Sequence, residues 1–221
     1  MPSPVAHALA GAAVYAALAP RGVSARDWRP WALAVFAGVA ADLDFLPGLL
    51  VGAPSRYHHW ATHSIAAALA FTLLVTPLVA PLLGSVARRL AILGVAYGSH
   101  LGLDVLTVDR TVPQGIPLLW PLSDAAFLSP VPLFIDIYHG SSWQAFVNWH
   151  NAGAALTEAL AVGLPVAVFC AVRLRPQAAR PGSPVSSRAL STRAVATRAV
   201  ATPPPPGGWG GGEGGVAGGP D

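Results

Sequence analysis

Histidines and carboxylates occur within long apolar stretches of the sequence, where ionisable groups are costly to place. The candidates are His7, Asp42, Asp44, His63, His100, Asp104 and Glu158, with His58 and His59 in a loop between two stretches. An ionisable side chain in a membrane helix costs roughly 2.5–3.5 kcal/mol on insertion scales. Neutral imidazole and ionised carboxylate are ligands of zinc and similar divalent ions, and the charge of the ion offsets the cost of burying the carboxylates. These residue types therefore predict a metal centre.

The spacing of two pairs indicates how this centre would be built. His100 and Asp104 are i and i+4, so on a helix both project from one face toward one ion. Asp42 and Asp44 are i and i+2 and would diverge by about 200° on a regular helix. Either the helix is irregular before Pro47, or the two acids serve different ions or shells. Zinc is the expected metal, as one ion or as a two-ion centre, and manganese is the alternative.

Five apolar stretches must position these groups. They cover residues 4–19, 31–51, 64–86, 90–108 and 152–172. A helix needs about 20 residues to cross a bilayer, and all but the first stretch reach that length. Hydrophobic residues make up 53% of the chain and charged residues 10%, against about 25% charged in soluble proteins. The expected fold is all-α, a polytopic transmembrane bundle of about five helices in the inner membrane of the cell.

Two further parts of the chain do not fit this helical pattern. Segment 109–151 is interrupted by prolines, so we expect it to form an external or re-entrant cap over the bundle. Residues 173–221 are rich in arginine, proline and glycine, a composition typical of disorder. The expected parts are a membrane-embedded domain, 1–172, and a disordered cytoplasmic tail, 173–221. Because the tail carries the excess of positive charge, the net charge of +3 does not indicate nucleic-acid binding.

The arginines predict the orientation of the helices. Loops 20–30 and 87–89 and the tail carry most of them, and positively charged loops stay in the cytoplasm. The N-terminus then faces outward, as do loops 52–63 and 109–151. In this orientation, the candidate histidines and acids of every helix lie near its outer end, and therefore in the outer half of the bilayer. We therefore expect these groups to converge near the outer face of the membrane.

Five blocks of sequence surround these residues. They are His7-Ala-Leu-Ala-Gly11, Ala41-Asp-Leu-Asp44, His58-His-Trp-Ala-Thr-His-Ser64, Ser99-His-Leu-Gly-Leu-Asp-Val-Leu-Thr107 and Gly115-Ile-Pro-Leu-Leu-Trp-Pro121. In these blocks the chain, over about residues 1–172, resembles the bacterial membrane-bound metal-dependent hydrolases, inner-membrane proteins that include LexA-regulated members. That family usually has Pro in place of Ala41 and Arg in place of His59, which leaves open whether His58 or His59 is a ligand. The order of His and Asp is more distantly similar to zinc-dependent phospholipase C and related nucleases.

The residues and the resemblance together imply a metal-dependent hydrolase that cleaves an ester or phosphoester bond with metal-activated water at the outer face. The expected metal ligands are His7, Asp42, Asp44, His58, His63, His100 and Asp104. Asp44 and Glu158 are the candidates for a general base or for a residue that orients a ligand. Membrane lipids are the expected partners, and a lipid or another phosphoester is the expected substrate, because the site would lie at the level of the headgroups.

Other classes of protein remain open at this point. A non-catalytic membrane protein could use the metal only to staple its helices. Ion or proton transport, or metal sensing, also uses intramembrane His and Asp, although a relay would need ionisable groups in the inner halves of the helices. A haem-binding bundle would leave the aspartates without a role. Taken singly, His7 fits an interfacial side chain, and His139 and His150 fit exposed loop residues.

Overall fold

The computed structural model of the protein describes residues 2–20, 27–52, 54–110, 114–138 and 147–173. The chain divides into two compact units, 1–176 and 177–221, and all described residues belong to the first. The predictions for the tail after residue 173 and for His139 concern residues outside the described part.

The described residues are helical or irregular. The helices are α1 (Pro4–Leu18), α2 (Arg29–Val39), α3 (Phe45–Leu50), α4 (Ile65–Val75), α5 (Ala80–Leu83), α6 (Val86–Val105), α8 (Trp149–Glu158) and α9 (Leu164–Arg173). Short 3₁₀ turns cover Ala40–Asp44, Pro54–Tyr57 and Ala61–His63, and a π-helical segment, Ala159–Gly163, joins α8 to α9. No strand occurs among these residues, where β pairing is limited to isolated bridges such as Thr107 with Phe134. The expected all-α class is confirmed.

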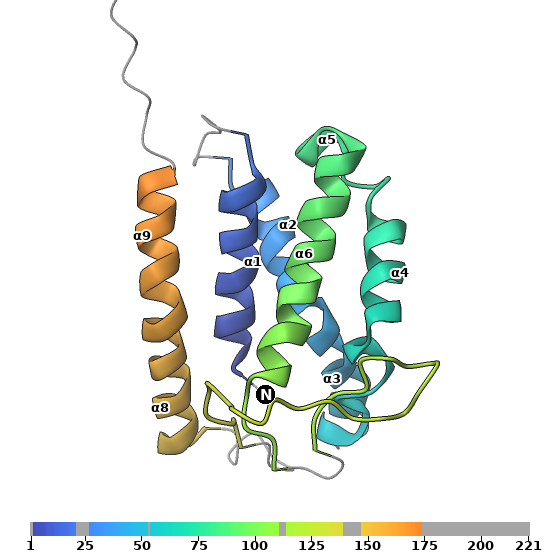
Figure 1. Cartoon of the computed structure of the whole chain (residues 1–221), viewed down its shortest axis with the longest axis vertical. Coiled ribbons are helices and arrows are strands. Elements are labelled where there is room, and N and C mark those ends of the chain that lie inside the picture. The colour runs from blue at the N-terminus through green and yellow to red at the C-terminus, as the bar shows by residue number, and fades with distance from the viewer. Residues whose placement is uncertain (1, 21–26, 53, 111–113, 139–146, 174–221) are drawn as a thin grey trace, which may run out of the picture. The chain divides into compact units, whose positions relative to one another are not determined.

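The long helices lie side by side in this unit (Figure 1). Helix α1 packs against α2, α6 and α9, and α6 also packs against α2 and α4. The apolar core between them includes Tyr15, Ala34, Ile92 and Leu93, all buried. Helix α1 begins, and α6 ends, at the same end of the unit, and we call this the cap end. Residues 107–110 and 114–138 lie across it, and we call them the cap segment (Figure 1).

The cap segment is tied to the helices through its backbone. The Ile65 amide, at the start of α4, donates to the Leu118 carbonyl at 2.9 Å, and the Val108 amide donates to the Phe134 carbonyl at 3.1 Å. Gly115 has a φ of 95° and lies so close to the Phe127 carbonyl that a Cβ atom would clash with it, so no larger residue fits this turn. The segment therefore covers the ends of α4 and α6, as a cap was expected to do.

Two of the described helical segments are long and apolar enough to cross a membrane, Arg29–Gly48 and Trp149–Arg173. Helices α1 and α4 are apolar but shorter. The prediction of a single helix over 64–86 is wrong, because α4 ends at Val75 and a turn precedes α5. Pro77 and Pro81 lack the amide hydrogens that a continuous helix would use there. The stretch 31–51 also bends, since a 3₁₀ turn separates α2 from α3.

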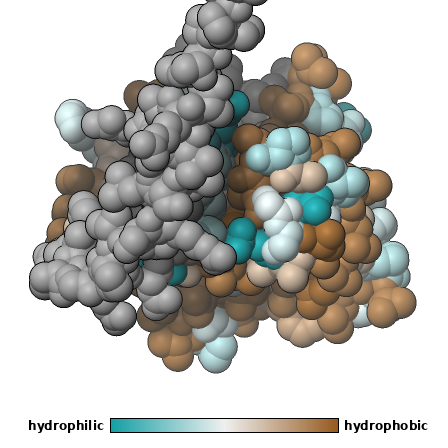
Figure 2. Space-filling model, turned by 90° about the horizontal axis from the view of Figure 1, so that it is seen from above, coloured by the Kyte–Doolittle hydropathy of each residue, from teal (hydrophilic) through white to brown (hydrophobic). Residues whose placement is uncertain are grey.

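Large apolar side chains are exposed along the sides of the unit. From α8 through the π-helical segment into α9 they recur every four residues, at Leu156, Leu160, Leu164 and Val168. Seen along the helices from the end opposite the cap end, hydrophobic residues surround a smaller hydrophilic group on the visible face (Figure 2). Soluble monomers rarely expose an apolar surface of this extent, whereas a lipid environment favours it.

Candidate metal centre

The cap end brings together side chains from four separate parts of the chain. His7 comes from the second turn of α1, His100 and Asp104 come from the last turns of α6, and His63 ends the 3₁₀ turn before α4. Asp42 lies in the 3₁₀ turn that follows α2. The side chains of His7, His63, His100 and Asp104 are buried, and that of Asp42 is about 10% exposed. We call these five residues the central cluster.

Carboxylate oxygens of Asp42 and Asp104 lie near the facing ring nitrogens of His63 and His100 in the central cluster. The Nε2 atoms of His63 and His100 lie 3.2 Å apart. Asp104 Oδ2 lies 3.5 Å from the first and 3.1 Å from the second, and Asp42 Oδ1 lies 3.7 and 3.5 Å from them. Zinc with ligands at about 2.05 Å in a tetrahedron separates them by about 3.3 Å. The spacing of His63, His100 and Asp104 is therefore close to that of three ligands in a zinc coordination shell, and Asp42 lies beside them in a second group with His7 and His100.

Contacts of the Nδ1 atoms of His63 and His100 determine that the Nε2 atoms of the two rings face each other. The Nδ1–H of His100 donates to the Gly38 carbonyl at 2.8 Å, and Nδ1 of His63 lies 3.2 Å from Asp44 Oδ2. When Nδ1 carries the hydrogen, Nε2 presents a lone pair. Two lone pairs that face each other at 3.2 Å repel, so a proton or a cation must lie between them. Carboxylate–histidine and carbonyl–histidine contacts of this kind accompany metal-ligating histidines.

The carboxylates of the cluster lack hydrogen-bond donors. Both carboxylate oxygens of Asp42, both of Asp104 and both ring nitrogens of His7 are buried without a hydrogen-bond partner among the described residues. An ionised carboxylate buried in this way is strongly destabilising unless a cation compensates it. The cluster therefore fits a divalent ion better than it fits an empty apolar core.

His7 completes one side of the central cluster. Its ring stacks on that of His100 at a centroid distance of 3.7 Å, and its Nε2 lies 3.5 Å from Asp104 Oδ1. Two glycines permit this approach: a Cβ on Gly38 would lie 2.6 Å from the His7 carbonyl oxygen, and a Cβ on Gly11 would clash with the Ala34 backbone. Small residues at a helix contact let the backbones approach closely. Helices α1 and α2 can therefore bring His7 to the cluster.

Asp44 and His58 lie beside the central cluster rather than in it. Asp44 Oδ1 is 2.8 Å from His58 Nδ1, while its Oδ2 accepts a hydrogen bond from the Thr62 hydroxyl at 2.7 Å and faces His63. In a 3₁₀ turn, residues i and i+2 point about 240° apart. This geometry explains why Asp42 and Asp44 have different neighbours, and the helix is irregular before Pro47, as the first of the two expectations for this pair stated.

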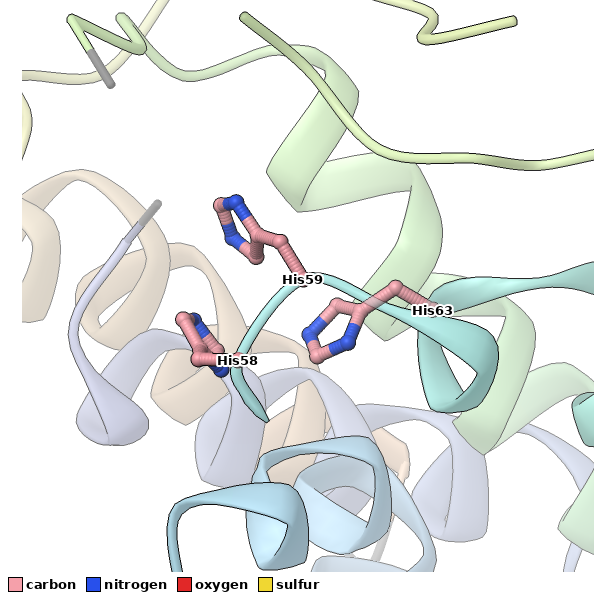
Figure 3. A group of neighbouring side chains, drawn as sticks. All are labelled: His58, His59 and His63. Carbon is pink, nitrogen blue, oxygen red and sulfur yellow. The ribbon is translucent and has the colours of Figure 1, made fainter. Parts of the chain in front are cut away.

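Three histidines crowd the turn before α4 (Figure 3). The ring centroids of His58 and His59 are 4.2 Å apart, and those of His59 and His63 are 5.0 Å apart. Burial lowers the pKa of His59 to about 3, and the neighbouring histidines add to this effect. Burial also lowers the pKa of His63, but the neighbouring carboxylates of Asp42 and Asp44 outweigh this effect and raise the pKa to about 10.

Glu158 has a different environment. Its Oε2 accepts hydrogen bonds from the backbone amide and the hydroxyl of Ser3, and the side chain is buried. None of its described contacts is with the central cluster, so they give no support to its predicted role as a general base. They instead hold α8 to the residue that precedes α1. His150 also differs from its prediction as an exposed loop residue, because it is half-buried in the first turn of α8 and stacks on Tyr138.

Sequence reasoning missed three residues that contribute to this region. Thr62 orients Asp44, and the carbonyl of Gly38 orients His100. Asp109 lies 3.7 Å from His59 through Oδ2 and Nδ1, and it also accepts a hydrogen bond from the Gly115 amide. Thr62 could have been found from its place beside His63. A backbone carbonyl, in contrast, leaves no signal in a sequence.

An all-helical unit with apolar sides and a buried histidine–carboxylate cluster at one end defines a membrane protein with a candidate metal centre. The sequence model of the YdjM inner membrane protein family matches residues 1–176, and the chain belongs to this family. This match supports a bacterial inner-membrane protein, as was predicted. No curated protein and no solved structure matches the chain.

Proposed function

We propose that the protein is a membrane-bound metal-dependent hydrolase that cleaves an ester or phosphoester bond. The observation that carries the proposal is the pair of Nε2 atoms of His63 and His100, 3.2 Å apart and flanked by buried carboxylates without donors. Asp42, His63, His100 and Asp104 would hold the ion, with His7 as a further ligand. Zinc is the preferred metal, since the donors would be imidazole nitrogen and carboxylate oxygen atoms, and manganese is the alternative.

The bound ion would supply a Lewis acid that polarises the scissile bond and lowers the pKa of water. The residues of the chain would position it. Asp44 would orient the His63 ring through Nδ1 and would itself be held by Thr62. Gly38 would orient His100 in the same manner. These contacts support Asp44 as a residue that orients a ligand.

A hollow beside Asp44 supports a lipid as the substrate. Its volume is about 370 Å³, and it is lined by Leu43, Tyr57 and Trp60 together with Asp44 and Thr62. Leu43 and Trp60 are exposed, at 43% and 61%. An apolar chain could therefore lie against these residues while its headgroup reaches the cluster. In the orientation that the arginines favour, the N-terminus is outside, and the cluster faces the outer leaflet of a multi-pass protein.

A non-catalytic role, in which the ion only staples the helices, is the second candidate. It is favoured by the origin of the ligands, which come from four separate segments of the chain. Transport has less support, because the buried histidines and carboxylates of the described residues gather toward the cap end and form no path along the helices.

Metal analysis of the detergent-purified protein tests the proposal. We expect stoichiometric zinc or manganese in the wild type, loss of the metal in Asp104→Asn, and retention in Asp124→Asn, which changes an exposed acid of the cap segment. Hydrolysis of ester or phosphodiester lipids by the wild type, lost with the metal, would support the enzyme. Metal without turnover on either class would favour the stapled protein. A wild type without metal would refute both.

A further inference from the structure

A second group of potential ligands lies next to the central cluster. We propose that His58, His59 and Asp44 hold a second divalent cation, with Asp109 orienting His59. A catalytic role for this ion rests on the proposed function. Its binding, in contrast, can be measured without any assay of activity. The central cluster does not use His58 or His59, so the two groups have separate donors.

The geometry of the three histidines supports the site. His58, His59 and His63 each offer a nitrogen, and these atoms all lie within 4.8 Å of one another. His63 already directs Nε2 to the central cluster and Nδ1 to Asp44. The outer oxygen of Asp44, Oδ1, faces His58 at 2.8 Å. Asp44 can therefore link the two positions, with one oxygen toward His63 and the other toward the second ion.

His59 is the residue that distinguishes this site. Its Nε2 is buried and has no hydrogen-bond partner among the described residues, while its Nδ1 faces Asp109 Oδ2 at 3.7 Å. With the Asp109 carboxylate near Nδ1, the ring atom that remains to hold a metal is Nε2. Figure 3 shows His59 beside His58 on the same turn, with His63 following.

The backbone of His59 adds an independent observation. Its φ is 62°, in the left-handed region, and it is the one described non-glycine residue with a positive φ. A non-glycine residue in this conformation costs free energy and persists where its surroundings hold it. The strained turn places the His59 ring 4.2 Å from that of His58, centroid to centroid. The two imidazoles therefore lie side by side at the proposed site.

The chemistry of a second ion suits the proposed reaction. Two-metal sites place ions about 3.5–4 Å apart and stabilise both the attacking and the leaving oxygen of a phosphoryl transfer. Asp44 would contribute to both positions, directly to the second ion and through His63 to the first. A phosphodiester or phosphomonoester lipid, rather than a carboxylic ester, is then the favoured substrate class.

Zinc titration of the metal-free protein in detergent tests this site, with content measured after gel filtration. We expect two zinc ions per chain in the wild type and one in His59→Asn, because asparagine tolerates the left-handed backbone but carries no imidazole. His150→Asn, a half-buried histidine in contact with Asp136, is the matched control and should retain two. Asp104→Asn should lose the ion of the central cluster, although its His59 is unchanged.

Each outcome decides one of the two proposals. One zinc ion in the wild type, or two in His59→Asn, overturns the second site and leaves the central cluster intact. No zinc in the wild type overturns the central cluster and the proposed function as well. The midpoint of thermal unfolding of His59→Asn is compared with that of the wild type, both without metal. Similar midpoints would show that the variant loses zinc without losing its fold.

Discussion

The contact between α1 and α2 allows the candidate centre to be disturbed without changing any ligand. In Gly38→Ala the new Cβ would lie 2.6 Å from the His7 carbonyl oxygen, where ordinary contacts begin at 3.4 Å. The helices must therefore separate locally by about 0.8 Å, the shortfall between these two values. Metal sites tolerate ligand displacements of only about 0.2 Å, so His7 would leave its position beside Asp104.

A displacement of about 1 Å in a catalytic constellation can reduce the rate about 100-fold. Because His7 would be one ligand of several in the proposed centre, and Gly38 also contacts His100, we expect zinc affinity in Gly38→Ala to fall by about 10- to 100-fold. Competition with a chromophoric chelator in detergent measures this affinity. Gly102→Ala is the matched control, since its Cβ on α6 would meet nothing within 4 Å. Zinc affinity in Gly38→Ala within twofold of the wild type would refute the reasoning, as would an equal loss in Gly102→Ala.

Three further predictions concern groups around the cluster. Asp44→Asn should weaken zinc binding by about 10- to 100-fold, the usual cost of losing a residue that orients a ligand, whereas Asp124→Asn should leave it unchanged in the same competition assay. The pKa of His63 is raised to about 10 in the metal-free protein, so zinc must displace the proton of this ring. Zinc affinity should therefore rise with pH, by up to about tenfold per pH unit below pH 10. A zinc affinity that stays constant between pH 6 and 9 would contradict this expectation. Ser3→Ala removes the hydroxyl that donates to the buried Glu158 carboxylate. The free energy of unfolding should fall by about 1–3 kcal/mol, seen as a lower midpoint of thermal unfolding. An unchanged midpoint would contradict the role assigned to this contact.

The parts of the site that the sequence could predict are those that depend on residue type and helix period. His100 and Asp104 share a face of α6 because they are one helical turn apart, and both are buried together with His63. The convergence of His7 and Asp42 followed from the alternating direction of the helices. Both inferences depend on regular geometry, which a sequence carries.

The parts that the sequence could not predict depend on irregular backbone. The 3₁₀ turn that separates Asp42 from Asp44, and the left-handed residue His59, have no strong local signature. The break between α4 and α5 was marked by Pro77 and Pro81, but apolar composition concealed it. The contact of Glu158 with Ser3 could not be predicted either, because depth along α8 says nothing about lateral distance and Ser3 is far away in the sequence.

The chain order of the central cluster bears on how the protein is made. Its members end at Asp104, whereas α8 and α9 begin at Trp149 and supply none of them. During synthesis the nascent chain therefore contains every group of the central cluster before its longest apolar helical segment emerges from the ribosome. The segment from α8 to α9 contacts the rest through α1 and through the Glu158–Ser3 hydrogen bonds, and it completes a unit in which the residues of the central cluster are already present.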